Sequence, residues 1–120
     1  MSSKKGNSIY LNRITQLLYR ARPRLAATRR LEFKNVFGAV GGYLEGEIFI
    51  SCGRFGVALK LSSQRIKKLM EEHGVKRLKY FKNGHIKKDY VVLPKKIIED
   101  EIRFKKLINE SINDRKFLLR

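Results

Sequence analysis

The fold is decided by residues 31–61, which read LEFKNVFGAVGGYLEGEIFISCGRFGVALKL. Apolar and polar residues alternate from Leu31 to Phe37, as they do in a strand with one buried face. Three glycines within residues 38–42 bend or loosen this strand. Turn residues at Glu45-Gly46 and Gly53-Arg54 separate the apolar segments that follow. The stretch therefore predicts a three-stranded antiparallel meander.

An amphipathic helix precedes the meander. Its apolar residues recur at i, i+4, i+7, i+8 and i+11, so they line one stripe of a helix that Ser8 can cap and that Pro23 stops. They are Tyr10, Ile14, Leu17, Leu18 and Ala21.

Two further helices are expected after the meander. Ser62 or Ser63 supplies the N-cap of a helix that buries Ile66, Leu69 and Met70 and ends at Gly74. Residues 95–98 form one helical turn, and Asp100 then caps a final helix. Its inward residues are Phe104, Leu107, Ile108 and Ile112.

Asn83-Gly84 is the strongest short-range signal in the chain. It lies between two segments of strand-like sequence, residues 78–82 and 85–93, and both turn residues tolerate the positive φ of a type I′ hairpin. Pro94 ends the second segment. We therefore expect a second hairpin with its turn at Asn83-Gly84. Neither of its faces is cleanly apolar, so the alternation leaves open which one is buried.

These elements predict an α+β domain with two layers, in the order α-β-β-β-α-β-β-α, with an antiparallel sheet packed against helices. A length of 120 residues and 42% apolar residues suit one domain with a real core. We expect that domain to span residues 1–120, with residues 1–7 and 113–120 as frayed tails.

The charge is strongly positive, with 28 Lys and Arg against 11 Asp and Glu, a formal net charge of +17. Polyanions are the partners that such a charge favours. Residues 1–40 hold nine basic residues and one acidic, and residues 76–97 hold eight and one. The excess is thus concentrated in the first helix with its exit, and in the second hairpin.

These two basic segments supply the candidate nucleic-acid-binding residues. Guanidinium groups match phosphate oxygens in pairs, which favours phosphate binding by the first segment. The candidates are Arg13, Arg20, Arg22, Arg24, Arg29, Arg30, Lys79, Lys82, Lys87 and Lys88. Aromatic residues near the lysines, Tyr80, Phe81 and Tyr90, could stack on bases. The alternative is that these are solvated faces and core aromatics.

The sequence contains no reaction centre, and we expect neither enzymatic activity, a cofactor nor a metal site. His73 and His85 are too few for a metal, and the acidic residues fall at turns, polar helix faces and helix starts. A lone cysteine, Cys52, excludes an internal disulfide and points to a reducing compartment. No signal peptide or spanning segment is recognisable, so we expect a cytoplasmic protein without membrane association.

Residues 33–112 resemble the N-terminal domain of the TfoX/Sxy family of bacterial competence regulators. The motif is Val36-Phe37-Gly38-x-x-Gly41-x-Tyr43-Leu44-x-Gly46-x-Ile48-Phe49, followed by Leu59-Lys60, Tyr80, Gly84, Tyr90 and Leu93-Pro94. The resemblance implies a two-layer fold and co-regulation of transcription with a cyclic-AMP receptor protein. It includes no catalytic motif. The chain ends too soon for the family's C-terminal helical domain, so a stand-alone domain is expected.

We therefore hypothesise a non-enzymatic regulatory or interaction domain that associates with DNA through basic surfaces. Its partner would be nucleic acid, bound with low specificity, or a transcription regulator protein. Two alternatives remain open. One is a general DNA- or RNA-binding protein unrelated to competence, and the other is an adaptor that docks an acidic protein surface.

Overall fold

The computed structural model describes the backbone of residues 2–118 and the side chains of residues 8–113. Within residues 2–118 it contains five helices and six strands. The helices are α1 (Ser2–Ala21), α2 (Pro23–Ala26), α3 (Ser63–Leu69), α4 (Lys95–Glu99) and α5 (Glu101–Leu118). The strands are β1 (Leu31–Val36), β2 (Ala39–Leu44), β3 (Glu47–Gly53), β4 (Gly56–Lys60), β5 (Lys76–Leu78) and β6 (Lys87–Leu93).

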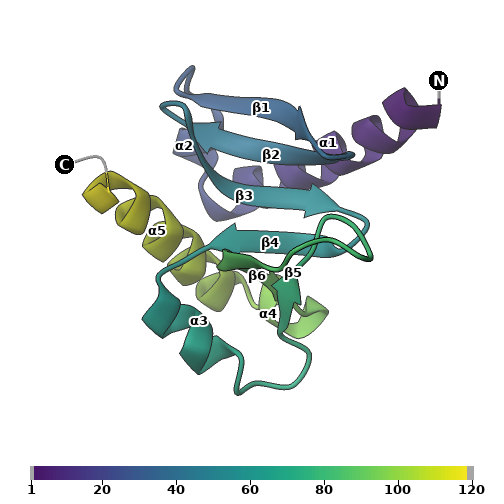
Figure 1. Ribbon diagram of the computed structural model, residues 1–120. Helices are drawn as coiled ribbons and strands as arrows, with labels where there is room; N and C mark the ends of the chain where they lie inside the picture. The colour runs from purple at the N-terminus through teal and green to yellow at the C-terminus, as the bar shows by residue number, and fades with distance from the viewer. Residues whose placement is uncertain (1, 119–120) are drawn as a thin grey trace.

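The strands form one antiparallel sheet in the order β1-β2-β3-β4-β6-β5 (Figure 1). From β1 to β4 each strand pairs with the next one along the chain. β6 then pairs with β4, and β5 lies at the edge beside β6. The predicted α+β fold with an antiparallel sheet is confirmed.

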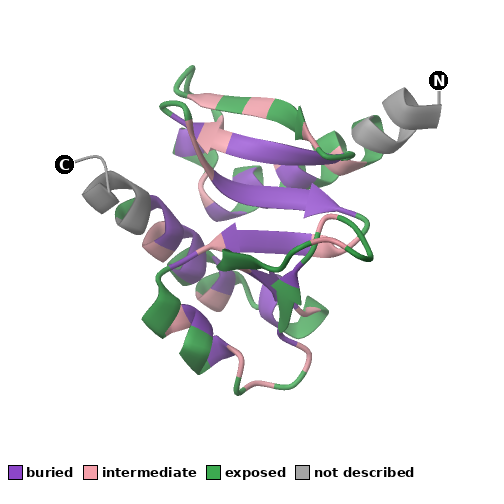
Figure 2. Cartoon of the chain, in the orientation of Figure 1, coloured by how far each residue is buried: buried purple, intermediate pink, exposed green. Residues whose placement is uncertain are grey.

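Helices α1 and α5 cover one face of this sheet and lie behind it in Figure 1. Helix α1 packs on β2 and β3, and α5 packs on β3 and β4, so these three strands are largely buried (Figure 2). The inward residues predicted for both helices are buried, apart from the half-buried Tyr10. The buried ones are Ile14, Leu17, Leu18, Ala21, Phe104, Leu107, Ile108 and Ile112.

The meander has four strands rather than the predicted three. The chain reverses at Phe37-Gly38, where φ is 47° and 80°, and again at Glu45-Gly46, where φ is 53° and 83°. Two positive φ values in a two-residue connection are the geometry of a type I′ turn, whose twist matches that of the strands. The alternation through Phe37 hid the first of these turns. The third turn lies at Arg54-Phe55, one residue later than predicted.

The predicted second hairpin forms from β5 and β6, but the type I′ turn predicted at Asn83-Gly84 is wrong. Neither residue has a positive φ, and the tight turn spans residues 81–84, where Gly84 N donates to the carbonyl oxygen of Phe81 at 3.0 Å. Strand β5 ends at Leu78, which pairs with Lys87. Residues 79–86 therefore form a loop rather than the continuation of two strands. Burial of loop side chains against the sheet, described below, outweighs the local preference of the Asn-Gly pair.

The expected caps at Ser62 and Asp100 are present, whereas α3 ends at Leu69 and not at Gly74 as predicted. Ser62 Oγ accepts a hydrogen bond of 3.2 Å from Arg65 N, and Asp100 Oδ1 accepts one of 3.1 Å from Arg103 N. Ser8 lies inside α1 instead of capping it, because the apolar stripe marks where a helix packs and not where it starts. Residues 1–7 and 113–120 are the expected frayed tails. Apart from Asn113 they lie outside the residues whose side chains the structure describes, so the fraying stays a prediction.

Two polar contacts hold α5 in place. Its buried Ser111 hydroxyl lies 2.9 Å from the carbonyl oxygen of Phe49 in β3 and 2.6 Å from that of Lys60 in β4. Near the other end, both terminal nitrogens of Arg103 donate to the two carboxylate oxygens of Glu72, in the segment after α3. The guanidinium lowers the pKa of Glu72. Helix α5 thus ties the meander to the second half of the chain.

Replacing Gly42 by alanine is expected to destabilise the fold by about 1–3 kcal/mol, the usual result of overpacking a core. A Cβ at this position would lie 2.6 Å from Ile50 Cγ2 and 3.7 Å from Ile14 Cδ1 of α1. The Ile50 methyl is fixed close to the backbone and cannot move aside. Urea denaturation measures the change.

Gly41→Ala is the matched control, because this neighbour points to the opposite face of the sheet. There a Cβ would lie 2.8 Å from Ile48 Cδ1, the mobile end of a half-buried side chain. Gly41→Ala should destabilise less than Gly42→Ala. The opposite order would show that the helix-covered face has room at Gly42.

Glu72→Gln is expected to lower stability at pH 7 and to have little effect in acid. A carboxyl group whose pKa is lowered by folding stabilises the protein above its unfolded value of about 4.3, and this stabilisation is lost as the pH falls through the folded value. Both side chains are about one-third exposed, so the effect is modest. Urea midpoints across this pH range, with the exposed neighbour Glu71→Gln as control, measure it. Equal pH dependence in both variants would contradict the role of the Arg103 pair.

Candidate nucleic-acid interface

The sheet face opposite α1 and α5, here called the helix-free face, has its own small apolar cluster. Ala58, Leu78 and Val92 are buried there, with Phe55, Tyr80 and Tyr90 packed against them. Since no helix within residues 2–118 lies on this side of β3 and β4, the loop of residues 79–86 provides the cover (Figure 1).

Tyr80 fixes this loop to the sheet. Its hydroxyl lies 3.3 Å from the hydroxyl of Ser51 in β3, a side chain that is fully buried. Burial raises the pKa of the Tyr80 phenol. It also raises the pKa of Tyr90, with smaller contributions from Tyr80 and Tyr43. The tyrosines on this face are therefore uncharged at neutral pH and act as hydrogen-bonding aromatic surfaces.

Four rings from three segments form an aromatic cluster on this face: Phe37, Phe55, Tyr80 and Phe81. Tyr80 is central, with its ring centroid 5.3 Å from that of Phe37 and 5.5 Å from that of Phe55. Phe37 and Phe81 lie 5.8 Å apart, edge to face. Both are 59% exposed. The cluster thus has a half-buried base, formed by Phe55 and Tyr80, and two rings that open to solvent.

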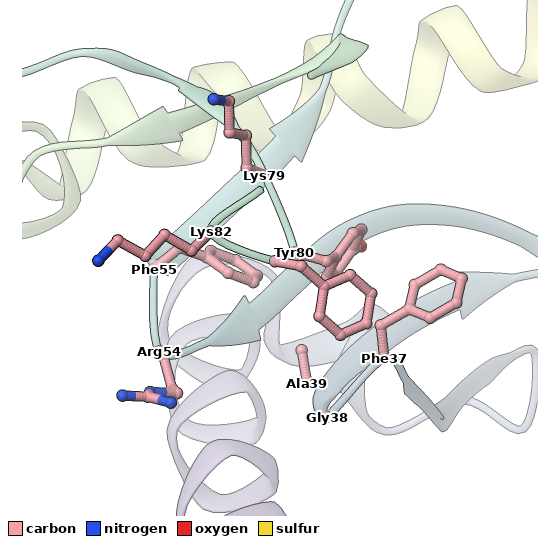
Figure 3. A pocket seen from close by; sticks show the side chains of 9 residues that line it. Phe37, Gly38, Ala39, Arg54, Phe55, Lys79, Tyr80 and Lys82 are labelled. Carbon is pink, nitrogen blue, oxygen red and sulfur yellow. The ribbon is translucent and has the colours of Figure 1, made fainter. Parts of the chain in front are cut away.

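Cationic side chains surround the cluster. A hollow of about 560 Å³ is lined by Phe37, Tyr80 and Phe81 together with Arg54, Lys79 and Lys82. Figure 3 shows the charged ends of these three cations pointing outwards from the aromatic rings. A second hollow of about 180 Å³ shares the same three rings and adds His85 and Lys87. The Lys87 ammonium lies 5.9 Å from the centre of the Phe37 ring.

None of the four candidate lysines pairs with a carboxylate among the described residues. Lys79, Lys82, Lys87 and Lys88 are all exposed, and the ion pairs within residues 8–113 involve other cations. Their charges remain available to an anionic partner. The structure brings Lys79, Lys82 and Lys87 to the aromatic cluster, and Lys88 follows at the start of β6.

Several of the candidate arginines have structural contacts instead. Arg20 donates to the carbonyl oxygen of Ile98 at 2.5 Å and lies over the Phe104 ring. Arg22 donates to the side chain of Asn109, and Arg30 pairs with Glu45. Arg24 and Arg29 are exposed. The arginines that hold the first segment to α4, α5 and the β2–β3 turn are thus already occupied.

Arg13 and Arg20 of the first basic segment lie on a different surface from Lys79, Lys82 and Lys87 of the second. Arg13 and Arg20 line a separate hollow of about 570 Å³ between α1, α4 and the helix-covered side of β4 and β6. Lys79 and Lys82 belong to the loop of residues 79–86, which lies across the sheet on the helix-free face (Figure 1). The two groups of cations are therefore separated by the sheet.

Nothing in the described part of the chain points to metal or redox chemistry. No group of three His, Cys, Asp or Glu side chains among the described residues could hold a metal ion. The Cys52 thiol is buried in the main core, and burial raises its pKa. No helix within the described residues is long and apolar enough to cross a membrane.

Sequence reasoning missed three residues of this interface, namely Phe37, Arg54 and Phe55. The alternation of apolar and polar residues assigns Phe37 to a strand, although the glycine after it is a signal for a two-residue turn. Arg54 and Phe55 form the turn between β3 and β4. Only the folded sheet brings them to the loop of residues 79–86. No spacing in the sequence indicates that approach.

The free energy of unfolding of alanine variants distinguishes arginines with structural contacts from exposed ones. Arg20→Ala is expected to lower the free energy of unfolding by about 1 kcal/mol, since it removes a hydrogen bond to Ile98 and a contact with Phe104. Arg24→Ala removes the same charge from an exposed site and should change it by less than about 0.5 kcal/mol. Thermal or urea unfolding compares the two. Equal effects would argue against a structural role for Arg20.

The chain matches the family model of the TfoX N-terminal domain over residues 24–114. Comparison with curated proteins and with solved structures gives no match. The matched range includes the whole sheet and the aromatic cluster, whereas α1 precedes it. TfoX N-terminal domains are regulatory domains that are not known as enzymes. Because the match covers most of the 120 residues, the chain belongs to the TfoX N-terminal domain family, as the resemblance predicted.

Proposed function

We propose that this domain is a regulatory module that binds nucleic acid in the cytoplasm, without catalysis, through the lysines on its helix-free face. The observation that carries the proposal is the combination of an exposed aromatic cluster with unpaired cations around it. In the family's setting, this binding would contribute to transcriptional regulation at competence genes. A transcription regulator protein would then be a further partner.

Electrostatics supports a polyanionic partner. The net charge of +17 attracts phosphates over the whole molecule. Four cations, Arg54, Lys79, Lys82 and Lys87, line the two hollows that flank the exposed rings. Neither hollow is lined by a carboxylate. An anion placed there would meet attraction from several sides without local repulsion.

The lysines are better candidates for this contact than the arginines. Binding through Arg20, Arg22 or Arg30 would compete with their contacts to Ile98, Asn109 and Glu45. The lysines would exchange water for phosphate and leave the fold unchanged. In addition, the hollow that Arg13 and Arg20 line contains Glu99, which pairs with Lys95.

The triple variant Lys79→Gln, Lys82→Gln and Lys87→Gln tests the proposal. Each phosphate contact releases slightly less than one counterion, so log K falls linearly with log salt. Removing three contacts should flatten that slope by about two to three units and weaken binding at low salt. Titration of a labelled oligonucleotide between about 50 and 200 mM salt measures both.

The matched control is Lys67→Gln, Lys68→Gln and Lys106→Gln, which removes the same charge from exposed positions on α3 and α5. Its slope should stay close to that of the parent protein. Equal flattening in both triple variants would show that binding is diffuse and would refute the lysine surface. Absence of binding to any nucleic acid at low salt would refute the function itself and leave an acidic protein as the partner.

A further inference from the structure

We infer that the aromatic cluster binds the unpaired bases of single-stranded nucleic acid, with Phe37 and Phe81 as the stacking platforms. The inference rests on the proposed function and adds to it the kind of nucleic acid and the way it is held. Phosphate contacts alone bind single and double strands alike, whereas exposed ring faces select a strand whose bases are free to stack.

Exposure of these two rings is the first argument. Phe37 and Phe81 are large and apolar, yet each is 59% exposed, and they meet in one patch. A contiguous exposed apolar patch with a polar rim is typical of a binding surface. Tyr80 and Phe55 beneath them are anchored to the sheet, so the patch has a firm base.

Ring geometry is the second argument. Phe37 meets Tyr80 at an interplanar angle of 57° and Phe81 at 66°. The rings are therefore not stacked face to face on one another, and at 59% exposure Phe37 and Phe81 both keep surface open to solvent. The two hollows share the same three rings and are lined by cations. A base can occupy each hollow against a ring, with its phosphate near Lys79, Lys82 or Lys87.

The backbone at Phe37 is the third argument. Its φ of 47° lies in the left-handed region, where a bulky aromatic residue is rare and strained. In a type I′ turn with Gly38, asparagine is the favoured residue at this position. A phenylalanine there does not stabilise the turn, but it places an exposed ring next to Phe81 and Lys87.

These features favour a single strand over a duplex. In a duplex the base faces are covered by neighbouring bases, and only base edges and the sugar-phosphate backbone are accessible. Three of the four cations that line the hollows are lysines, whose ammonium groups are point charges without the planar fork that reads a base edge. Binding should therefore be tolerant of sequence, as stacking usually is.

The test compares Phe37→Asn and Phe81→Leu with the control Tyr19→Leu. Asparagine removes the ring and relieves the strain at positive φ, and leucine retains apolar bulk without a π-face. Tyr19 is 58% exposed on α1, outside the interface, so its variant controls for loss of an exposed ring. The probe is a labelled mixed-sequence single-stranded oligonucleotide, titrated beside the duplex of the same sequence.

Phe37→Asn and Phe81→Leu should each weaken single-strand binding by about tenfold, the usual size of one stacking contact. The dependence on salt should keep its slope, because no phosphate contact is lost. Duplex binding should be weaker in the parent protein and unchanged in both variants, and Tyr19→Leu should behave like the parent. Unfolding curves confirm that the variants are folded.

Four results would overturn the inference. If single-strand affinity is unchanged in both ring variants, or if the parent binds the duplex as tightly, the rings are not stacking platforms and the lysine-based function stands alone. If neither nucleic acid binds at low salt, the proposed function fails and the inference fails with it. If an acidic peptide competes and the ring variants lose that peptide equally, the patch is a protein-docking surface.

Discussion

Burial of one sheet face under α1 and α5 is the constraint on which the rest of the structure depends. The two helices meet β2, β3 and β4 from one side, so the large apolar side chains of these strands collect there with Ile14, Leu18 and Phe104. Several opposite positions on the central strands are small, namely Gly41, Ser51 and Ala58. This group of small residues gives little apolar area for a helix to bury, and a loop with one large ring can cover it.

The position of the loop of residues 79–86 follows from that constraint. Tyr80 fills the space over Ser51 and packs with Phe55. Phe81, the next residue, then projects to solvent and meets Phe37 from the β1–β2 turn. The candidate interface is therefore assembled from two hairpin turns and a loop that are distant in sequence. The packing of Tyr80 on the sheet also holds Lys79 and Lys82, which belong to the same loop, near the rings.

Local patterns predicted the helices, their buried stripes and most of the strands, because period and capping are properties of neighbouring residues. They failed where tertiary packing decides. The Asn83-Gly84 pair predicts a tight turn between two long strands. Burial of Tyr80 on the sheet instead keeps residues 79–82, which precede this pair, from forming a regular strand. The turn at Phe37-Gly38 is not predicted by the local pattern, because an aromatic residue at positive φ is too rare to expect. The candidate lysines could be predicted from charge, whereas their aromatic neighbours Phe37 and Phe55 could not.

Local sequence patterns also do not show which charged side chains make contacts within the protein. For this reason charge density indicates both basic segments equally, although several arginines of the first make internal contacts and the lysines of the second are exposed. A guanidinium offers a planar fork of donors and is weakly hydrated, so it is readily used in contacts within the protein, as at Arg20, Arg22 and Arg103. An ammonium on a flexible stem is strongly hydrated and stays at the surface, as at Lys79 and Lys82. In this chain arginines are therefore drawn first into contacts that hold the helices to one another and to the segment after α3. The exposed lysines keep free charge, and three of them, Lys79, Lys82 and Lys87, gather beside the exposed rings.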